Sequence, residues 1–465
     1  MNDGVQNFKY SSDLIFGLNN HNKTLVKHYF WVFIITLASI RGAFVYHLGL
    51  PPNEFYMATG MMLIAFGLLS LCTIIRKCSY SELALFKSAI KVNVLFLGFY
   101  TVIYIALKDV SFSSIAYQFL VFPIIFVLIR YDEKLSRLII NLISMVTLFG
   151  VIYFYNIGIT GGFDAMEAAK LTLRPGELYY SRIGEHLLPG GYQADHHDAA
   201  NILVMCSLYF LSQAMILQSR LRALFNMFIY FICLSLLILT GSSANIIIAI
   251  IISVLAIYIY AKSHPWITIL WVCLFALVIA LYIDDLSYYL YFYDNATQNQ
   301  ADLEGNGMFN SLDLNSLFLS LPSIFMGFGN ILEVPLMKSE IAFIKQLIGF
   351  GFVPFIVFSF ILFSPNYYLY KFASKTRSQV KFLKIHSSRA SSNVFSGLSR
   401  EMRYRLIMAA MPCLAGALTM LHYGSLMRVT SVGLFCVFLA LFYKKYVEFT
   451  RVAMDRFENS YKFGL

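Results

Sequence analysis

The sequence predicts an all-α protein: a polytopic bundle of transmembrane helices with about twelve spans, forming one integral membrane domain over residues 1–465. Two observations support this prediction. The chain is 59% hydrophobic and 13% charged, with a mean hydropathy of +0.68, whereas soluble domains are about half apolar and about a quarter charged. The apolar residues also fall into blocks of ~20 residues, the length that crosses a bilayer as a helix.

The predicted spans follow one another along the chain, with short polar turns between most of them. They cover residues 29–48, 55–75, 88–107, 112–129, 136–155, 198–217, 223–240, 244–261, 265–283, 340–363, 404–422 and 427–443. The first 28 residues are polar, so we expect the first helix to insert the chain without a cleavable signal. All seven cysteines lie in or beside spans and none forms a CxxC pair, so we interpret them as small apolar residues.

The net charge of +10 follows from topology and does not indicate nucleic-acid binding. With the N-terminus in the cytoplasm and an even number of spans, roughly three quarters of the lysines and arginines fall on the cytoplasmic side, as the positive-inside rule requires. In this arrangement the outer side receives only Lys108, Lys170, Arg174, Arg182 and Lys338. The basic excess therefore indicates contact with anionic lipid, and we expect no nucleic-acid partner.

Two long loops fall on the outer side, at residues 156–197 and 284–339. On the cytoplasmic side, residues 364–403 are basic and contain the Ser-rich stretch SSRASSNVFSGLSR. We expect this segment to be a mobile cytoplasmic loop. The two outer loops are the places where soluble-phase chemistry can occur.

The first outer loop retains Arg174 and Arg182 although positive charge is otherwise avoided on that side. Guanidinium groups bind phosphate oxygens through two parallel hydrogen bonds and stay charged at neutral pH. An anionic group at the outer membrane face, such as a lipid-linked diphosphate, would explain both residues. The alternative is ion pairing within the loop, with Glu177, Glu185 or Asp195.

The stretch ADHHDAAN, residues 194–201, opens the sixth span. Asp195 and Asp198 are three residues apart and share a helix face if the helix starts this early, whereas His196 and His197 do not. Adjacent histidines are poorly placed to ligate one metal from a regular helix, and no Glu-x-x-His pair is present, so no metal site is expected. Either aspartate can cap the helix, and either histidine or a nearby carboxylate can act as a base or orient a hydroxyl.

The second outer loop is acidic and rich in tyrosine, a composition that suits either stacking on sugar rings or, as we favour, an interfacial belt. Within it, SLFLSLPSIFMGFGN at 316–330 is too short to span and predicts a helix that lies on or re-enters the membrane, ended by Gly327 and Gly329. The start of the tenth predicted span is preceded and opened by three charged residues, Glu333, Lys338 and Glu340.

Arg41 lies past the middle of the first span, toward the outer side. An unpaired arginine within the bilayer is expensive, so we expect it to face the bundle or a wet cavity. Diphosphate binding and structural pairing with a neighbouring helix are both open as its role.

These features resemble the bacterial O-antigen polymerase and ligase superfamily, most closely the Wzy-type polymerases, whose two periplasmic loops have an arginine followed at a set distance by glycine. Here fifteen residues separate Arg174 from Gly190, and ten separate Lys338 from Gly349. The stretches LPSIFMGFGN, SEIAFIKQLIGFGFVPFI and ILTGSSANIIIAIII are similar to three further elements of the family. The resemblance covers nearly the whole chain.

The sequence departs from the family pattern in two places. The arginine that the family places in the third of these elements is absent, since positions 243–245 are Ser243, Ala244 and Asn245. The second loop contains no histidine, whereas ligases of the superfamily use one there. This difference favours a polymerase and leaves the identity of any base open.

The resemblance implies a glycosyltransferase of the bacterial inner membrane that polymerises oligosaccharide repeat units carried on undecaprenyl diphosphate, in the lipid bilayer, without metal or cofactor. An acceptor hydroxyl would attack the anomeric carbon, and lipid diphosphate would leave. Arg174 and Arg182 would stabilise the leaving group, and His196, His197, Asp195 and Glu340 are the base candidates. Arg41, Lys338, Gly190 and Tyr192 are the candidate substrate-binding residues.

Other functions compete with this interpretation. An O-antigen ligase would use the same donor with lipid A core as acceptor. A lipid-linked oligosaccharide flippase would fit the number of spans, but it needs charged residues through the bilayer, and most spans here have none. A membrane acyltransferase would need its His-Asp pair at the cytoplasmic or midplane face. Expected protein partners of a polymerase are a chain-length regulator and a flippase.

Overall fold

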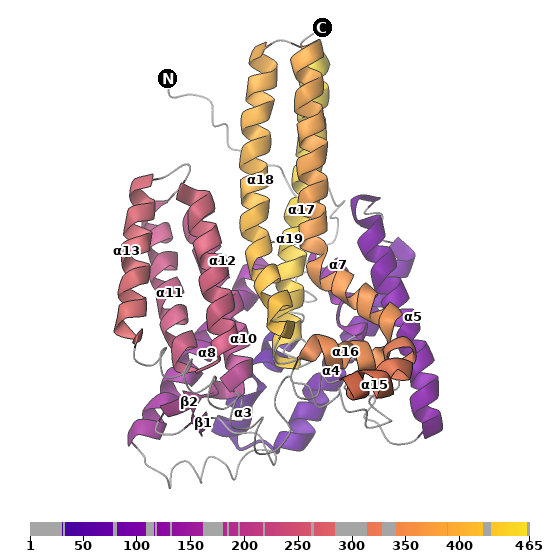
Figure 1. Ribbon diagram of the computed structural model, residues 1–465, viewed down its shortest axis with the longest axis vertical. Coiled ribbons are helices and arrows are strands. Elements are labelled where there is room, and N and C mark those ends of the chain that lie inside the picture. Colours follow the sequence, from indigo (N-terminus) through magenta and orange to yellow (C-terminus); the bar gives the residue numbers. More distant parts are fainter. Residues whose placement is uncertain are drawn as a thin grey trace.

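The computed structural model describes residues 30, 33–77, 81–107, 116, 119–130, 133–160, 180–183, 186–193, 196–216, 219–261, 265–283, 314–327, 341–387, 389–421 and 429–462. Within them, the chain is an α-helical bundle with one two-stranded hairpin (Figure 1). The α-helices are α3 (Arg41–Leu48), α4 (Pro52–Lys77), α5 (Ala84–Leu107), α7 (Ile124–Leu128), α8 (Glu133–Thr160), α10 (His196–Ile216), α11 (Arg220–Leu239), α12 (Ser243–Ala261), α13 (Pro265–Leu281), α15 (Leu314–Met326), α16 (Ala342–Phe350), α17 (Phe352–His386), α18 (Arg389–Leu418) and α19 (Val429–Lys462).

Seven helices in the described part of the chain are long and apolar enough to cross a membrane: α4, α5, α8, α10, α11, α17 and α18. Shorter apolar helices cover Ser243–Ile259, Trp271–Leu281 and Leu317–Met326. The prediction of an all-α membrane bundle is therefore confirmed. Four of the cysteines, Cys206, Cys233, Cys413 and Cys436, are free and buried, which agrees with their interpretation as small apolar residues.

Helix α10 is the centre of the bundle. Of its apolar window, 94% is buried, against 61% or less for the six other candidate spans. It packs against α8, α11, α12, α18 and α19. A helix that is apolar on all sides is expected in a core, and small residues such as Ala199, Ala200 and Ser207, all buried, allow its neighbours to approach closely.

The hairpin lies between α8 and α10 in the sequence. Strand β1 (Tyr180–Ile183) pairs antiparallel with β2 (His186–Pro189), and Arg182 is opposite Leu187. The strands pack against α8, and a short 3₁₀ turn, η2 (Gly191–Gln193), connects them toward α10. We call this end of the bundle the hairpin end (Figure 1).

At the opposite end, α17, α18 and α19 extend beyond the other helices (Figure 1); we call it the stalk end. The expectation that 364–403 is a loop was wrong, because α17 continues to His386 and α18 begins at Arg389. Packing between helices explains the difference, since Phe382 contacts Phe457 and Tyr461 of α19. The 35 residues of α17 are about 52 Å long, so the helix must extend past a hydrocarbon core of about 30 Å.

The predicted span 340–363 is also not one helix. It breaks at Gly351, where φ is 84° and ψ is 173°, into α16 and α17. The hydroxyl of Tyr100 on α5 donates to the carbonyls of Phe350 and Met326, the last residues of α16 and α15. The predicted short helix before Gly327 is confirmed as α15, and it packs against α16.

Candidate functional site

A group of polar side chains, most of them buried, lies where α10 begins. It consists of His196, His197, Asp198 and Asn201 from α10, Ser242 and Asn245 from the turn into α12 and its first residues, and Thr430 from the start of α19; we call it the hairpin-end cluster. Two stretches singled out in the sequence, 194–201 and ILTGSSANIIIAIII at 238–252, therefore meet in space. Their meeting follows from the packing of α10 against α12.

Hydrogen bonds connect four members of the cluster in a row. Nδ1 of His197 lies 3.3 Å from Oγ of Ser242. Nδ2 of Asn245 donates to Oγ of Ser242 at 3.0 Å and to Oδ1 of Asn201 at 2.9 Å. Ser242 and Asn201 are each 1% exposed. The hydrogen bonds among these buried side chains therefore hold the His197 ring in one position.

Asp198 is 3% exposed and accepts a hydrogen bond from Oγ1 of Thr430 at 3.2 Å. It lies in the first turn of α10, where the helix dipole stabilises a negative charge. The carboxylate therefore helps to connect α10 with α19 at the hairpin end.

The two histidines are more accessible than the rest of the cluster. Their ring centroids are 3.9 Å apart, and both side chains are partly exposed. Part of each ring therefore reaches the surface at the hairpin end, and imidazole is a common base and hydrogen-bond partner. In the described part of the chain no three His, Cys, Asp or Glu side chains are grouped closely enough to hold a metal ion.

Three amide atoms in and beside the cluster are buried with no hydrogen-bond partner among the described residues: Oε1 of Gln193, Nδ2 of Asn201 and Oδ1 of Asn245. Leaving a buried polar atom unpaired costs about 1–3 kcal/mol. The cluster therefore has hydrogen-bonding capacity, both as donor and as acceptor, that the described residues do not use. A ligand rich in hydroxyl groups matches this capacity.

Tyr192 lies in η2, which packs on α3 and α8. Its side chain is 2% exposed, and its hydroxyl is hydrogen-bonded to Nε2 of His47. Burial raises the pKa of its phenol to about 12, so the group stays protonated at neutral pH. Gly42 and Gly150 leave the space that Tyr192 fills, since an added Cβ would come within 2.0 Å of its carbonyl and 2.5 Å of its ring, respectively. Tyr192 thus packs η2 on α3 and α8, and its substrate-binding role stays a prediction.

The other candidate residues fall into three groups. Gly190 is buried beside η2. Arg41 faces the bundle, as expected, with Cζ 4.1 Å from the ring centroid of Tyr56, a cation–π contact. The structure gives only the backbone of Arg182, in β1, and Arg174, Asp195, Lys338 and Glu340 lie outside the described residues.

Sequence reasoning missed Asn201, Ser242 and Thr430, and it noted Asn245 only as a departure from a family pattern. A signal was present, because each is a polar residue at the beginning of an apolar helix. Polar side chains at that position usually cap helices, so the sequence alone does not separate a cap from a member of a buried network.

Replacing Thr430 with valine removes the hydrogen bond to Asp198 while keeping the side-chain shape. Hydrogen bonds to charged groups contribute about 1.5–3 kcal/mol, so we expect a clear fall in the melting temperature of the detergent-solubilised protein. Thr376→Val is the matched control, because Thr376 is equally buried but bonds only to carbonyls of its own helix. Equal melting temperatures for the two variants would show that the Asp198–Thr430 contact does not stabilise the bundle.

The hairpin-end cluster thus combines a fixed histidine, a second accessible histidine, a buried carboxylate and unpaired amide groups. Such a set can bind hydroxyl groups and accept a proton. In comparisons with protein-family models, with curated proteins and with solved structures, nothing matches this chain.

Proposed function

We propose that the protein is a membrane glycosyltransferase that polymerises oligosaccharide repeat units carried on undecaprenyl diphosphate, at the periplasmic face of a bacterial inner membrane. The observation that carries the proposal is the hairpin-end cluster, with its unpaired buried amides and two partly exposed histidines. In the sequence the cluster histidines directly follow the loop that contains Arg174 and Arg182. Hydroxyl-rich sugar and anionic diphosphate are the two chemistries that this combination suits.

The proposed reaction breaks the bond between the anomeric carbon and the diphosphate oxygen of the donor glycan. The acceptor hydroxyl forms the new glycosidic bond, and its proton passes to a base, for which His196 and His197 are the described candidates. Negative charge develops on the departing diphosphate. Arginines fixed nearby stabilise that charge, an effect worth several kcal/mol, and this is the role assigned to Arg174 and Arg182.

The charge distribution supports the orientation that this reaction needs. The stalk end contains basic side chains such as Lys371, Arg377, Arg403 and Arg456 in the extended parts of α17, α18 and α19. By the positive-inside rule the stalk end is then cytoplasmic, and the hairpin end faces the periplasm, where assembled repeat units are presented.

Deleting the gene tests the proposal. A polymerase deletion should leave single repeat units on the surface and remove longer chains, as seen on a glycan ladder gel. Full-length polymer accumulating on the lipid carrier would assign the protein as a ligase instead, and repeat units trapped at the cytoplasmic face would assign it as a flippase. An unchanged ladder would contradict all three assignments.

Arg182→Lys is expected to lower polymer yield by about tenfold, because lysine keeps the charge but loses the paired hydrogen bonds of the guanidinium group, a difference of ~1.4 kcal/mol in the transition state. The measurement is the chain-length distribution in a deletion strain that expresses the variant. Lys170→Arg is the control, since it replaces lysine with arginine in the same loop, the reverse of the Arg182 substitution. Wild-type chains from Arg182→Lys would remove Arg182 from the site.

A further inference from the structure

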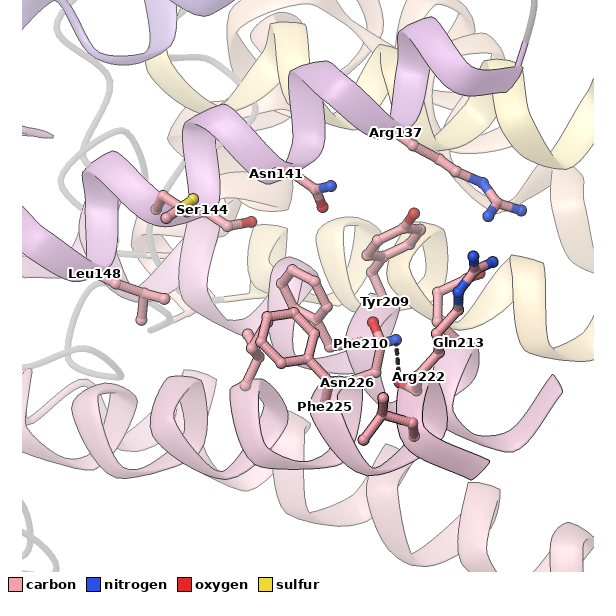
Figure 2. Close-up of a pocket in the computed structure, with 13 residues that line it drawn as sticks. Arg137, Asn141, Ser144, Leu148, Tyr209, Phe210, Gln213, Arg222, Phe225 and Asn226 are labelled. Carbon is pink, nitrogen blue, oxygen red and sulfur yellow. Dashed lines mark hydrogen bonds between the residues drawn. The ribbon is translucent and has the colours of Figure 1, made fainter. Parts of the chain in front are cut away.

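A groove between α8, α10 and α11 lies outside the hairpin-end cluster (Figure 2). Its volume is about 750 Å³. Tyr209 and Gln213 on α10, which line it, are at least eleven residues beyond Asp198, which is about 16 Å or more along the helix. The groove is therefore a separate site, and the inference drawn from it does not depend on the proposed function.

The lining of the groove is polar at one end and apolar at the other. Arg137 and Arg222 occupy the same end (Figure 2), near the starts of α8 and α11. Leu148 on α8 and Ile229 on α11 line the other end. Eleven residues separate Arg137 from Leu148 in number, about 16 Å of helix, so a ligand that fits must itself change from charged to apolar along its length.

Among the described residues at the polar end, cations outnumber carboxylates: Arg137, Arg222 and Lys445 lie near the single carboxylate of Glu133. Glu133 binds both Arg137 at 2.8 Å and Lys445 of α19 at 3.1 Å, so one carboxylate serves two cations. Arg222 makes no ion pair with a carboxylate in the part of the chain that is described. One carboxylate shared by Arg137 and Lys445 leaves net positive charge among the described groups facing the groove, which favours a negatively charged ligand.

Uncharged polar groups add hydrogen-bonding capacity beside the two arginines. The amides of Asn141 and Gln213 line the groove and have no hydrogen-bond partner among the described residues. Asn141 is eight residues past Glu133 within a candidate span, about 12 Å along the helix. A polar group at that depth is expected to be satisfied by a partner, and the ester and hydroxyl oxygens below a phosphate headgroup lie at such a depth.

The groove is open to the bilayer. Met145, Leu221 and Phe225 line it with side chains 69%, 79% and 63% exposed, and all three lie on or at the end of membrane-crossing helices. A ligand therefore enters from the side, from within the membrane. Since the arginines are at the stalk end, where basic residues gather, the leaflet concerned is the one that anionic lipid and basic protein segments share.

We propose that this groove binds an anionic glycerophospholipid, with the phosphate between Arg137 and Arg222 and an acyl chain along the apolar lining toward Leu148 and Ile229. The headgroup phosphate accepts hydrogen bonds from both guanidinium groups. The bound lipid closes the gap between α8 and α11 on the lipid-facing side of α10.

Native mass spectrometry of the purified full-length protein tests this assignment. The protein is incubated with equal amounts of palmitoyl-oleoyl phosphatidylglycerol and phosphatidylcholine, and the two adducts are compared. We expect a preference for phosphatidylglycerol that falls by about tenfold or more in the Arg137→Gln/Arg222→Gln double variant, since two charged hydrogen-bonding groups are lost. Arg220→Gln/Arg405→Gln is the matched control: Arg220 is on the same helix as Arg222 but outside the groove, and Arg405 has an i,i+4 ion pair like that of Arg137.

An equal preference in the double variant and its control would overturn the proposal. Ile229→Trp provides an independent check if the double variant does not fold, because it fills the apolar end and keeps both charges; unaltered phosphatidylglycerol retention in that variant would also overturn it. Displacement of phosphatidylglycerol by undecaprenyl phosphate at equal concentration would reassign the groove to the polyprenyl carrier. Displacement of phosphatidylglycerol by inorganic phosphate would overturn the lipid assignment and leave the groove as a site for the phosphate group alone.

Discussion

Replacing Gly327 with alanine is expected to disrupt the α15–α16 unit and to lower the stability of the protein by about 3–5 kcal/mol. Gly327 has φ of 84°, and an added Cβ would lie 2.1 Å from the Tyr100 hydroxyl and 2.2 Å from the carbonyl carbon of Phe350. Neither neighbour can move freely, because the Tyr100 hydroxyl is bonded to Phe350 and Met326. The measurement is the melting temperature of the detergent-solubilised protein, followed by size-exclusion chromatography.

Gly98→Ala is the control for this experiment. Gly98 lies on α5, two residues before Tyr100, and an added Cβ would meet nothing within 4 Å. Alanine is a better helix former than glycine by about 1 kcal/mol, so this variant should be as stable as the parent or more so. A second variant, Gly351→Ala, should behave like Gly327→Ala, since its φ is also 84° and the carbonyl oxygen of Phe325 is 2.8 Å from the added Cβ. If Gly327→Ala has the same melting temperature as Gly98→Ala, the packing of α15 on α16 does not stabilise the fold.

The Gly351 break illustrates what the sequence could and could not predict. A continuous apolar run over 340–363 predicts one span, and two glycines in it, at 349 and 351, are equal candidates for a break. In the structure the break lies at Gly351, and the hydroxyl of Tyr100, 250 residues away from Phe350, binds the carbonyl at the end of α16. A contact between positions so distant in sequence leaves no local pattern.

The stalk shows the same limit in a different form. Residues 364–403 have the serine content and charge of a mobile segment, and composition rules judge a segment by itself. In the structure, Phe395 and Phe382 both contact Phe457 of α19, and Oγ of Ser387 donates to the carbonyl of Ser460. Helical stability in proteins comes mostly from such packing, which requires knowing the partner helix.

In the candidate site, sequence analysis found the two stretches but not their pairing. The stretches 194–201 and 238–252 were each singled out, though not Asn201 or Ser242 within them, and α10 begins at His196, close to the predicted start of 198. That Asp198 binds Thr430, 232 positions later, depends on how α10 and α19 pack. Spacing rules describe positions on one helix, so they cannot predict contacts between helices.

Arg174→Ala is expected to have the largest effect on activity, a loss of about 10²–10³-fold in glycan chain formation, with single repeat units retained. The reason is chemical: removing a fixed cation beside a departing diphosphate leaves its developing charge unbalanced. Arg174→Lys should retain part of the activity, because the charge remains while the paired hydrogen bonds are lost. The measurement is a glycan ladder from a deletion strain that expresses each variant at matched levels.

Lys170→Ala is the matched control, since it removes the same charge four positions earlier in the same loop; similar losses in both variants would mean that overall loop charge matters and that Arg174 has no specific role. The location of residue 174 can be tested separately with Arg174→Cys and a membrane-impermeant maleimide in intact cells. Among the described cysteines Cys72 and Cys273 are exposed, and Cys78 lies outside the described residues, so all three should first be replaced by serine. Labelling only after the inner membrane is permeabilised would place residue 174 in the cytoplasm, where no arginine of this loop can meet a diphosphate at the outer face.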